Sequence, residues 1–91
     1  MKALPPEVAA YKRTPEFRED TIPPALRRAH DTKAGTWGRI VVLEGELLYR
    51  ILDPAVEETW LRPGVDGVVE PTVRHEVEAP GPVRFYVEFL R

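Results

Sequence analysis

Two histidines, His30 and His75, are the residues of this chain best suited to chemistry. Imidazole titrates near neutral pH and is the commonest metal ligand in proteins, so either ring can move a proton or bind a metal. The chain has no Ser and no Cys, which excludes a Ser-His-Asp triad, a thiolate nucleophile, a disulfide bond and a cysteine metal site. Any chemistry must therefore rest on the two imidazoles and on carboxylates that assist them.

His75 lies in a segment, Val73 to Glu78, whose composition predicts a β-strand. Alternation places its side chain on the same face as Val73 and Val77, away from the charged residues between them. A histidine that points with apolar residues is either a hydrogen-bonded core residue or part of a site, and both interpretations stay open here.

The elements that must position these histidines are short strands separated by Pro and Gly. The expected strands after Thr36 are Trp37 to Leu43, Glu46 to Leu52, Glu57 to Leu61, Gly67 to Glu70, Val73 to Glu78 and Val83 to Leu90. The first two are joined at Glu44-Gly45, which predicts a β-hairpin. Six strands at regular spacing indicate an all-β sandwich or barrel.

Prolines dominate the first thirty residues and forbid a long helix there. We expect a short edge strand at Val8 to Thr14 and one helical turn within Pro24 to His30. In the last strand, Val83, Phe85, Val87 and Phe89 share one face while Arg84, Tyr86 and Glu88 share the other. Alternation does not tell which of these faces looks inward.

The composition predicts one globular domain over residues 1–91, with 43% hydrophobic and 31% charged residues. With a net charge of -2, the chain lacks the excess of basic residues that is typical of nucleic-acid-binding proteins. No signal segment and no apolar run long enough for a bilayer are present, so we expect a cytoplasmic protein without a membrane partner. The lack of Asn, Gln and Cys beside 10 Pro is typical of a thermophile.

The segment His30 to Gly38, followed by Leu43-Glu44-Gly45, Glu70-Pro71 and His75, resembles the TehB/YeaR-like cupin family. In cupins, one motif carries two His and a Glu before a closing Gly, and a second carries one His after a Pro; Gly45 and His75 match the last member of each. The resemblance implies a small single-domain cupin-type β-barrel, jelly-roll-like, made of two facing antiparallel sheets. It implies no settled activity, because the methyltransferase activity of longer relatives resides in another domain.

The sequence departs from the cupin pattern where the first metal-ligand motif should fall. Asp31 to Lys33 and Gly38 stand there, and neither a His-x-His pair nor the motif Glu is present. A reduced site is expected instead, with His30, His75 and one carboxylate. Glu70 is the first candidate for this carboxylate and Glu88 the second. Such a set with water would suit zinc or ferrous iron. The alternative is that both histidines are hydrogen-bonded pocket residues without a metal.

Three functions are compatible with these residues. The first is a tellurite-resistance or stress-associated cupin that binds a metal, a small molecule or an oxyanion without catalysis. The second is a metal-dependent dioxygenase or isomerase that uses His30, His75 and a carboxylate. The third is a dimeric interaction module whose exposed strand edge pairs with another chain. We favour the first, leave enzymatic activity open and expect a homodimer, since 91 residues form only a modest core.

Overall fold

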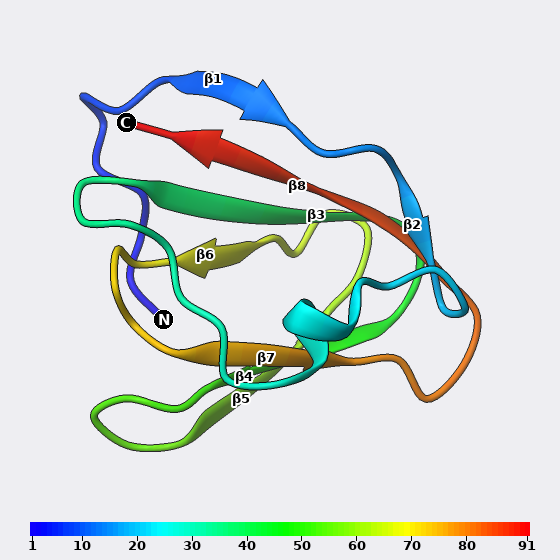
Figure 1. Ribbon diagram of the computed structural model, residues 1–91. Coiled ribbons are helices and arrows are strands. Elements are labelled where there is room, and N and C mark those ends of the chain that lie inside the picture. Colours follow the sequence, from blue (N-terminus) through cyan, green and yellow to red (C-terminus); the bar gives the residue numbers. More distant parts are fainter.

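Two antiparallel β-sheets make up most of the computed structural model, which describes all 91 residues (Figure 1). The larger sheet has the order β1-β8-β3-β6, and β2 also pairs with β8; the smaller sheet has the order β5-β4-β7. The strands are β1 (Ala10–Arg13), β2 (Phe17–Arg18), β3 (Trp37–Gly45), β4 (Leu47–Ile51), β5 (Glu57–Leu61), β6 (Gly67–Val69), β7 (His75–Glu78) and β8 (Val83–Leu90).

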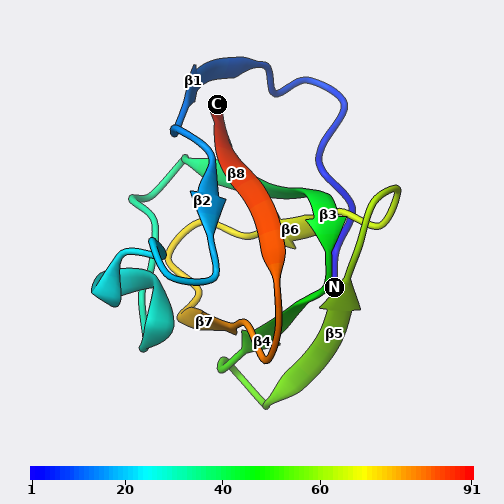
Figure 2. The same ribbon diagram turned by 90° about the vertical axis from the view of Figure 1, so that its right-hand side faces the viewer.

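The two sheets face each other across a shared apolar core (Figure 2). In β4, in β3 as far as Leu43 and in β8 as far as Val87, every second residue is buried, as expected when one face of a sheet packs against the core. The largest fully buried side chains are Tyr49, Phe85, Leu47 and Leu61. The prediction of an all-β domain with two facing antiparallel sheets is therefore confirmed, although the sheets stay separate and do not close into a continuous barrel.

The predicted hairpin at Glu44-Gly45 is wrong. β3 pairs with β6 and β8, whereas β4 pairs with β5 and β7, so the chain passes from one sheet into the other at this point. Gly45 has φ of +78°, and a Cβ built on it would lie 2.1 Å from the carbonyl oxygen of Pro82. Gly45 pairs with Val83 at the end of the β3–β8 ladder, so the glycine allows the backbone of β3 to lie close to the backbone that enters β8. Local sequence does not distinguish this role from a hairpin turn.

The other elements agree with expectation to within a few residues. β5 and β8 have the predicted bounds, β1 lies inside the predicted edge strand, and the helical turn is the 3-10 helix η1 (Pro24–Arg27). The two-residue strand β2 was not predicted. No helix in the structure has the length and apolar character needed to cross a membrane.

Candidate functional site

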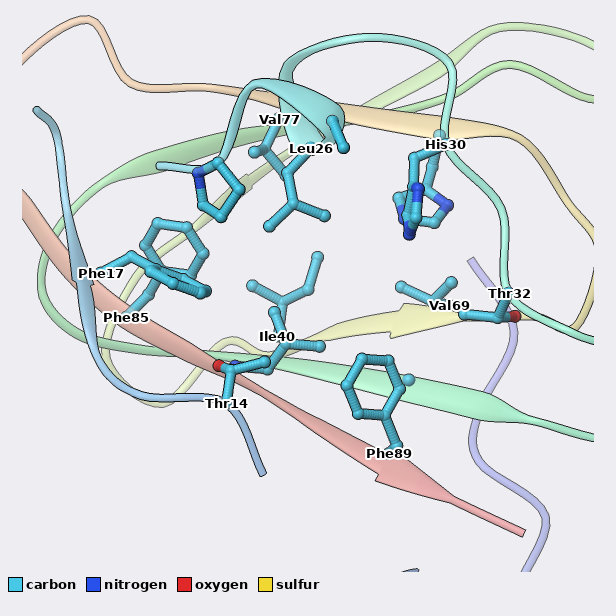
Figure 3. Close-up of a pocket in the computed structure, with 15 residues that line it drawn as sticks. Thr14, Phe17, Leu26, His30, Thr32, Ile40, Val69, Val77, Phe85 and Phe89 are labelled. Atoms are coloured by element: carbon cyan, nitrogen blue, oxygen red, sulfur yellow. The ribbon is translucent and has the colours of Figure 1, made fainter. Parts of the chain in front are cut away.

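A cavity of about 210 Å³ lies between the sheets and reaches the surface beside η1. Figure 3 shows Phe17 and Phe85 at one end of it, with His30, Thr32 and Val69 at the other. Nine of its 15 lining residues are hydrophobic, and none is Asp, Glu, Lys or Arg. The full lining is Thr14, Phe17, Pro23, Ala25, Leu26, His30, Thr32, Gly38, Ile40, Val69, His75, Val77, Phe85, Val87 and Phe89.

His75 lines this cavity from the first position of β7 and is only 4% exposed. Its Nδ1 lies 3.1 Å from the carbonyl oxygen of Val73. Because a carbonyl oxygen only accepts hydrogen bonds, Nδ1 must donate, and in the neutral ring Nε2 then keeps a free lone pair. Burial lowers the pKa of His75 below its usual value, against an opposing effect of the Val73 hydrogen bond, so the ring is neutral at pH 7.

His30 joins the same site from the loop after η1. Its backbone N–H donates to the His75 carbonyl and its carbonyl accepts from the His75 N–H, both at 2.8 Å. The ring centroids lie 5.5 Å apart with the planes at 81°. The two histidines predicted as site residues are thus brought together, and both line the cavity.

Tyr49 packs against His75 in the core. Its ring centroid lies 5.9 Å from that of His75, and its hydroxyl donates to the carbonyl of Val68 at 3.0 Å. Burial raises the pKa of Tyr49, and the charge of Glu70 adds to this rise. Tyr49 therefore buttresses His75 as a neutral, hydrogen-bonded phenol, outside the cavity lining.

The carboxylates expected beside the histidines have other partners. Glu70 pairs with the ammonium of Lys2 at 3.1 Å. Glu88 lies on the outer face of β8, opposite the cavity-lining Val87 and Phe89, and accepts hydrogen bonds from Arg39 and Arg13. Glu88 was therefore a wrong second candidate, since the apolar face of β8 is the one that looks inward.

The histidine pair supplies only part of a metal site. Two imidazoles on one tetrahedral zinc have ring centroids about 5 Å apart, close to the observed separation. No group of three or more His, Asp or Glu side chains could hold a metal ion in this structure, whereas protein zinc centres use three or four such ligands. The residues present therefore do not fit a zinc or iron centre held by this chain alone.

Several residues of the cavity escaped the sequence analysis. Phe17 packs edge-on against Phe85 with centroids 5.6 Å apart, and Leu26 covers the cavity from η1. Thr14 holds the loop before β2 against β8, because its hydroxyl accepts a hydrogen bond from the Val87 N–H at 2.9 Å. For Phe17 and Leu26 the only signal in the sequence is an apolar residue among prolines, which is too weak to reveal that these segments cover the cavity.

Comparison with known proteins adds a family model. The model of the TehB-like domain matches residues 12–87 of the chain. Two curated relatives from Haemophilus influenzae, from strains Rd and 10810, are 35% and 34% identical over 77 residues; each is described as a probable S-adenosyl-L-methionine-dependent methyltransferase TehB. The match covers 80% of this chain and 27% of each relative, so the chain spans about a quarter of their length.

Two solved structures have the same fold. The crystal structure of TehB from Haemophilus influenzae superposes with a TM-score of 0.85 at 31% identity, over 93% of this chain and 32% of that one. A crystal structure of a protein from Escherichia coli K12 superposes with a TM-score of 0.88 at 21% identity, over 100% of this chain and 97% of that one. The second likeness concerns the fold alone, and shows that the fold also occurs in a chain of similar length.

Proposed function

The chain belongs to the family of TehB-like domains, and from this premise we propose that it is a small-molecule-binding domain whose cavity holds a compact, largely apolar ligand. The observation that carries the proposal is the cavity itself, with its apolar walls and its histidine pair at one end. Methyl transfer is not part of the proposal, because the chain spans only 27% of the relatives to which that activity is ascribed.

The size of the cavity limits the ligand to about one ring. An engineered cavity of roughly 150 Å³ with similar apolar walls binds benzene. The present volume of about 210 Å³ has room for a substituted ring or a short branched chain. The free Nε2 of His75 can accept one hydrogen bond, so a single hydroxyl on the ligand would be oriented toward the histidine pair.

An oxyanion is a poor fit for the cavity interior. No Arg or Lys lines it, and His75 is neutral because burial lowers its pKa. Moving a small anion from water into such surroundings costs several kcal/mol or more without a compensating charge. The tellurite association of the family therefore does not argue for tellurite as an occupant of this space.

The test is a titration with toluene and with benzyl alcohol, followed by NMR shifts of the backbone amides. We expect saturable binding with the largest shifts in β7, β8 and η1. Ala25 is exposed and lies at the mouth of the cavity, so Ala25→Trp should weaken binding at least about tenfold. Ala29 is exposed on the same segment outside the lining, and Ala29→Trp is the matched control. Unchanged binding in Ala25→Trp, or no binding at all, would contradict the proposal.

A second candidate is a metal shared between the protein and a ligand. It is supported by the separation of the two rings and by the free Nε2 of His75. His30 and His75 would hold the ion, and the remaining positions would be filled by the small molecule or by water. Metal analysis of untagged protein after incubation with zinc distinguishes this candidate, which requires one bound ion that is lost in both His30→Ala and His75→Ala.

A further inference from the structure

A second hollow of about 250 Å³ adjoins the apolar cavity at its histidine end. His30, Thr32 and Phe89 line both spaces, so these three residues form the boundary between them. We call the second space the vestibule. Beyond the boundary it is lined by Tyr11 and Lys12 of β1 and by Asp31, Lys33 and Thr36 of the loop before β3.

The vestibule carries a net positive charge. Lys12 and Lys33 contribute two positive charges and Asp31 one negative charge, which gives +1, and none of the three is in a salt bridge. The chain has only three lysines; the third, Lys2, pairs with Glu70. Two of them therefore lie free at the entrance to an uncharged cavity.

Another polar hollow of the protein has the opposite balance. It is lined by Glu19, Glu76 and Glu78 with Arg27 and Arg50, which gives a net charge of -1. There Arg50 is already bound by Glu76 and also by Glu58. Arg27 is in no salt bridge, but the three carboxylates leave this hollow with a net negative charge, whereas that of the vestibule is positive.

We propose that the site takes an amphipathic monocarboxylate, with its apolar body in the cavity and its carboxylate in the vestibule beside Lys12 and Lys33. This inference rests on the proposed function and names its ligand class. The anion would stay partly hydrated in the vestibule, so it avoids the desolvation cost that the cavity interior imposes. Long lysine side chains on two separate elements can adjust to a carboxylate while their ammonium groups remain in water.

The boundary residues suit a ligand that extends from the cavity into the vestibule. Thr32 donates its hydroxyl hydrogen to the Thr36 carbonyl at 2.8 Å, which fixes the loop that carries Lys33. Phe89 offers an apolar surface on both sides of the boundary. His30 is half-buried there and can hydrogen-bond a polar atom at the junction between the apolar body and the carboxylate.

The experiment compares 3-phenylpropionate with 3-phenylpropan-1-ol, which share a carbon skeleton and differ in the charge of the head group. Isothermal titration calorimetry at low ionic strength should give about tenfold tighter binding of the acid, since two exposed ion pairs together contribute about that factor. This preference should shrink in 0.5 M salt, because both lysines are exposed. In the double variant Lys12→Glu/Lys33→Glu the preference should reverse while the alcohol binds as before.

Arg62→Glu is the control, since Arg62 is exposed, lies outside both spaces and makes no salt bridge. Retained binding of the alcohol shows that the double variant is folded. Equal affinity for acid and alcohol, or a preference that survives the double variant, overturns the carboxylate assignment and leaves the proposed function standing. Failure of both molecules to bind overturns the two together.

Discussion

The backbones of His30 and His75 exchange two hydrogen bonds of 2.8 Å, and their rings meet nearly at right angles 5.5 Å apart. His75 is the first residue of β7, an edge strand of the smaller sheet, and His30 extends that sheet by one isolated bridge. The pairing therefore fixes the loop between η1 and β3 onto the sheet that carries the buried imidazole. It also places both rings at the end of the cavity that adjoins the vestibule.

Replacing His75 should change how the stability of the protein depends on pH. Burial lowers the pKa of His75 in the folded state, so the unfolded chain binds a proton more readily. The stability is then fully present above pH about 6.5 and is lost as the pH falls toward the lower folded pKa. Urea unfolding at pH 7.5 and 5.5 should show a smaller loss for His75→Phe than for the unmodified protein. An equal loss in both would contradict this account.

Gly45→Ala should destabilise the protein severely. The new methyl group would meet the Pro82 carbonyl oxygen at 2.1 Å, and the backbone there has a φ of +78°. We expect a loss of about 3 kcal/mol or more in the free energy of unfolding. Gly64 is the control, because it also has positive φ but no atom within 4 Å of the position that a Cβ would take, so Gly64→Ala should cost only about 1 kcal/mol. Similar losses at the two positions would show that the backbones at Gly45 and Pro82 are not tightly packed.

Glu88→Gln should reduce stability at neutral pH and flatten its acid dependence. Hydrogen bonds from Arg39, and then from Arg13, lower the pKa of Glu88 against the effect of burial. Its stabilising charge is therefore present above pH about 4.5 and is lost as the pH falls through the lower folded pKa. Thermal or urea unfolding should show a loss of about 1–2 kcal/mol at pH 7 and little difference at pH 2.

The matched control for Glu88 is Glu46→Gln, because Glu46 is exposed and makes no ion pair or side-chain hydrogen bond. It should unfold like the unmodified protein at both pH values. A Glu88→Gln protein that is equally stable at pH 7 would mean that the ion pairs of Glu88 with Arg39 and Arg13 only offset the cost of burying its charge.

Phe17→Ala should enlarge the cavity and change the size of ligand it accepts. Phe17 closes one end of the space against Phe85 and is only partly buried, so we expect a loss of about 1–3 kcal/mol in stability. In the NMR titration, naphthalene should bind the variant better than the unmodified protein, while toluene should bind it more weakly. Unchanged preference would indicate that the side chains around position 17 collapse into the space.

Most strands were predictable because they are apolar or alternating runs next to Pro or Gly, as with β8, which directly follows Pro82. Their pairing was not. Glu44-Gly45 has the composition of a hairpin turn, and only the pairing of Gly45 with Val83 of β8, and of β4 with β5 and β7, reveals that β3 and β4 belong to different sheets. The pairing of Gly45 with Val83 joins residues far apart in sequence, which local patterns do not encode.

The candidate site was predictable to a similar degree. Alternation placed His75 with the apolar face, and the structure buries it there. Alternation also placed Glu88 on the opposite face of β8 from Val87 and Phe89. It did not tell which of the two faces points into the core, because this depends on which face of β8 meets the smaller sheet. The vestibule was out of reach, because Lys12 and Lys33 come together only through the packing of β1 and the loop before β3 against Phe89.

The place of β8 in the larger sheet has a consequence for biogenesis. β8 is the last strand along the chain, yet β1, β2 and β3 all pair with it. While the chain emerges from the ribosome, only the β4–β5 hairpin has its partner strands close together in sequence. In the larger sheet β3 can already pair with β6, but β1 and β2 have no partner strand until Val83 to Leu90 is made, so they and the wall of the cavity that they form assemble last.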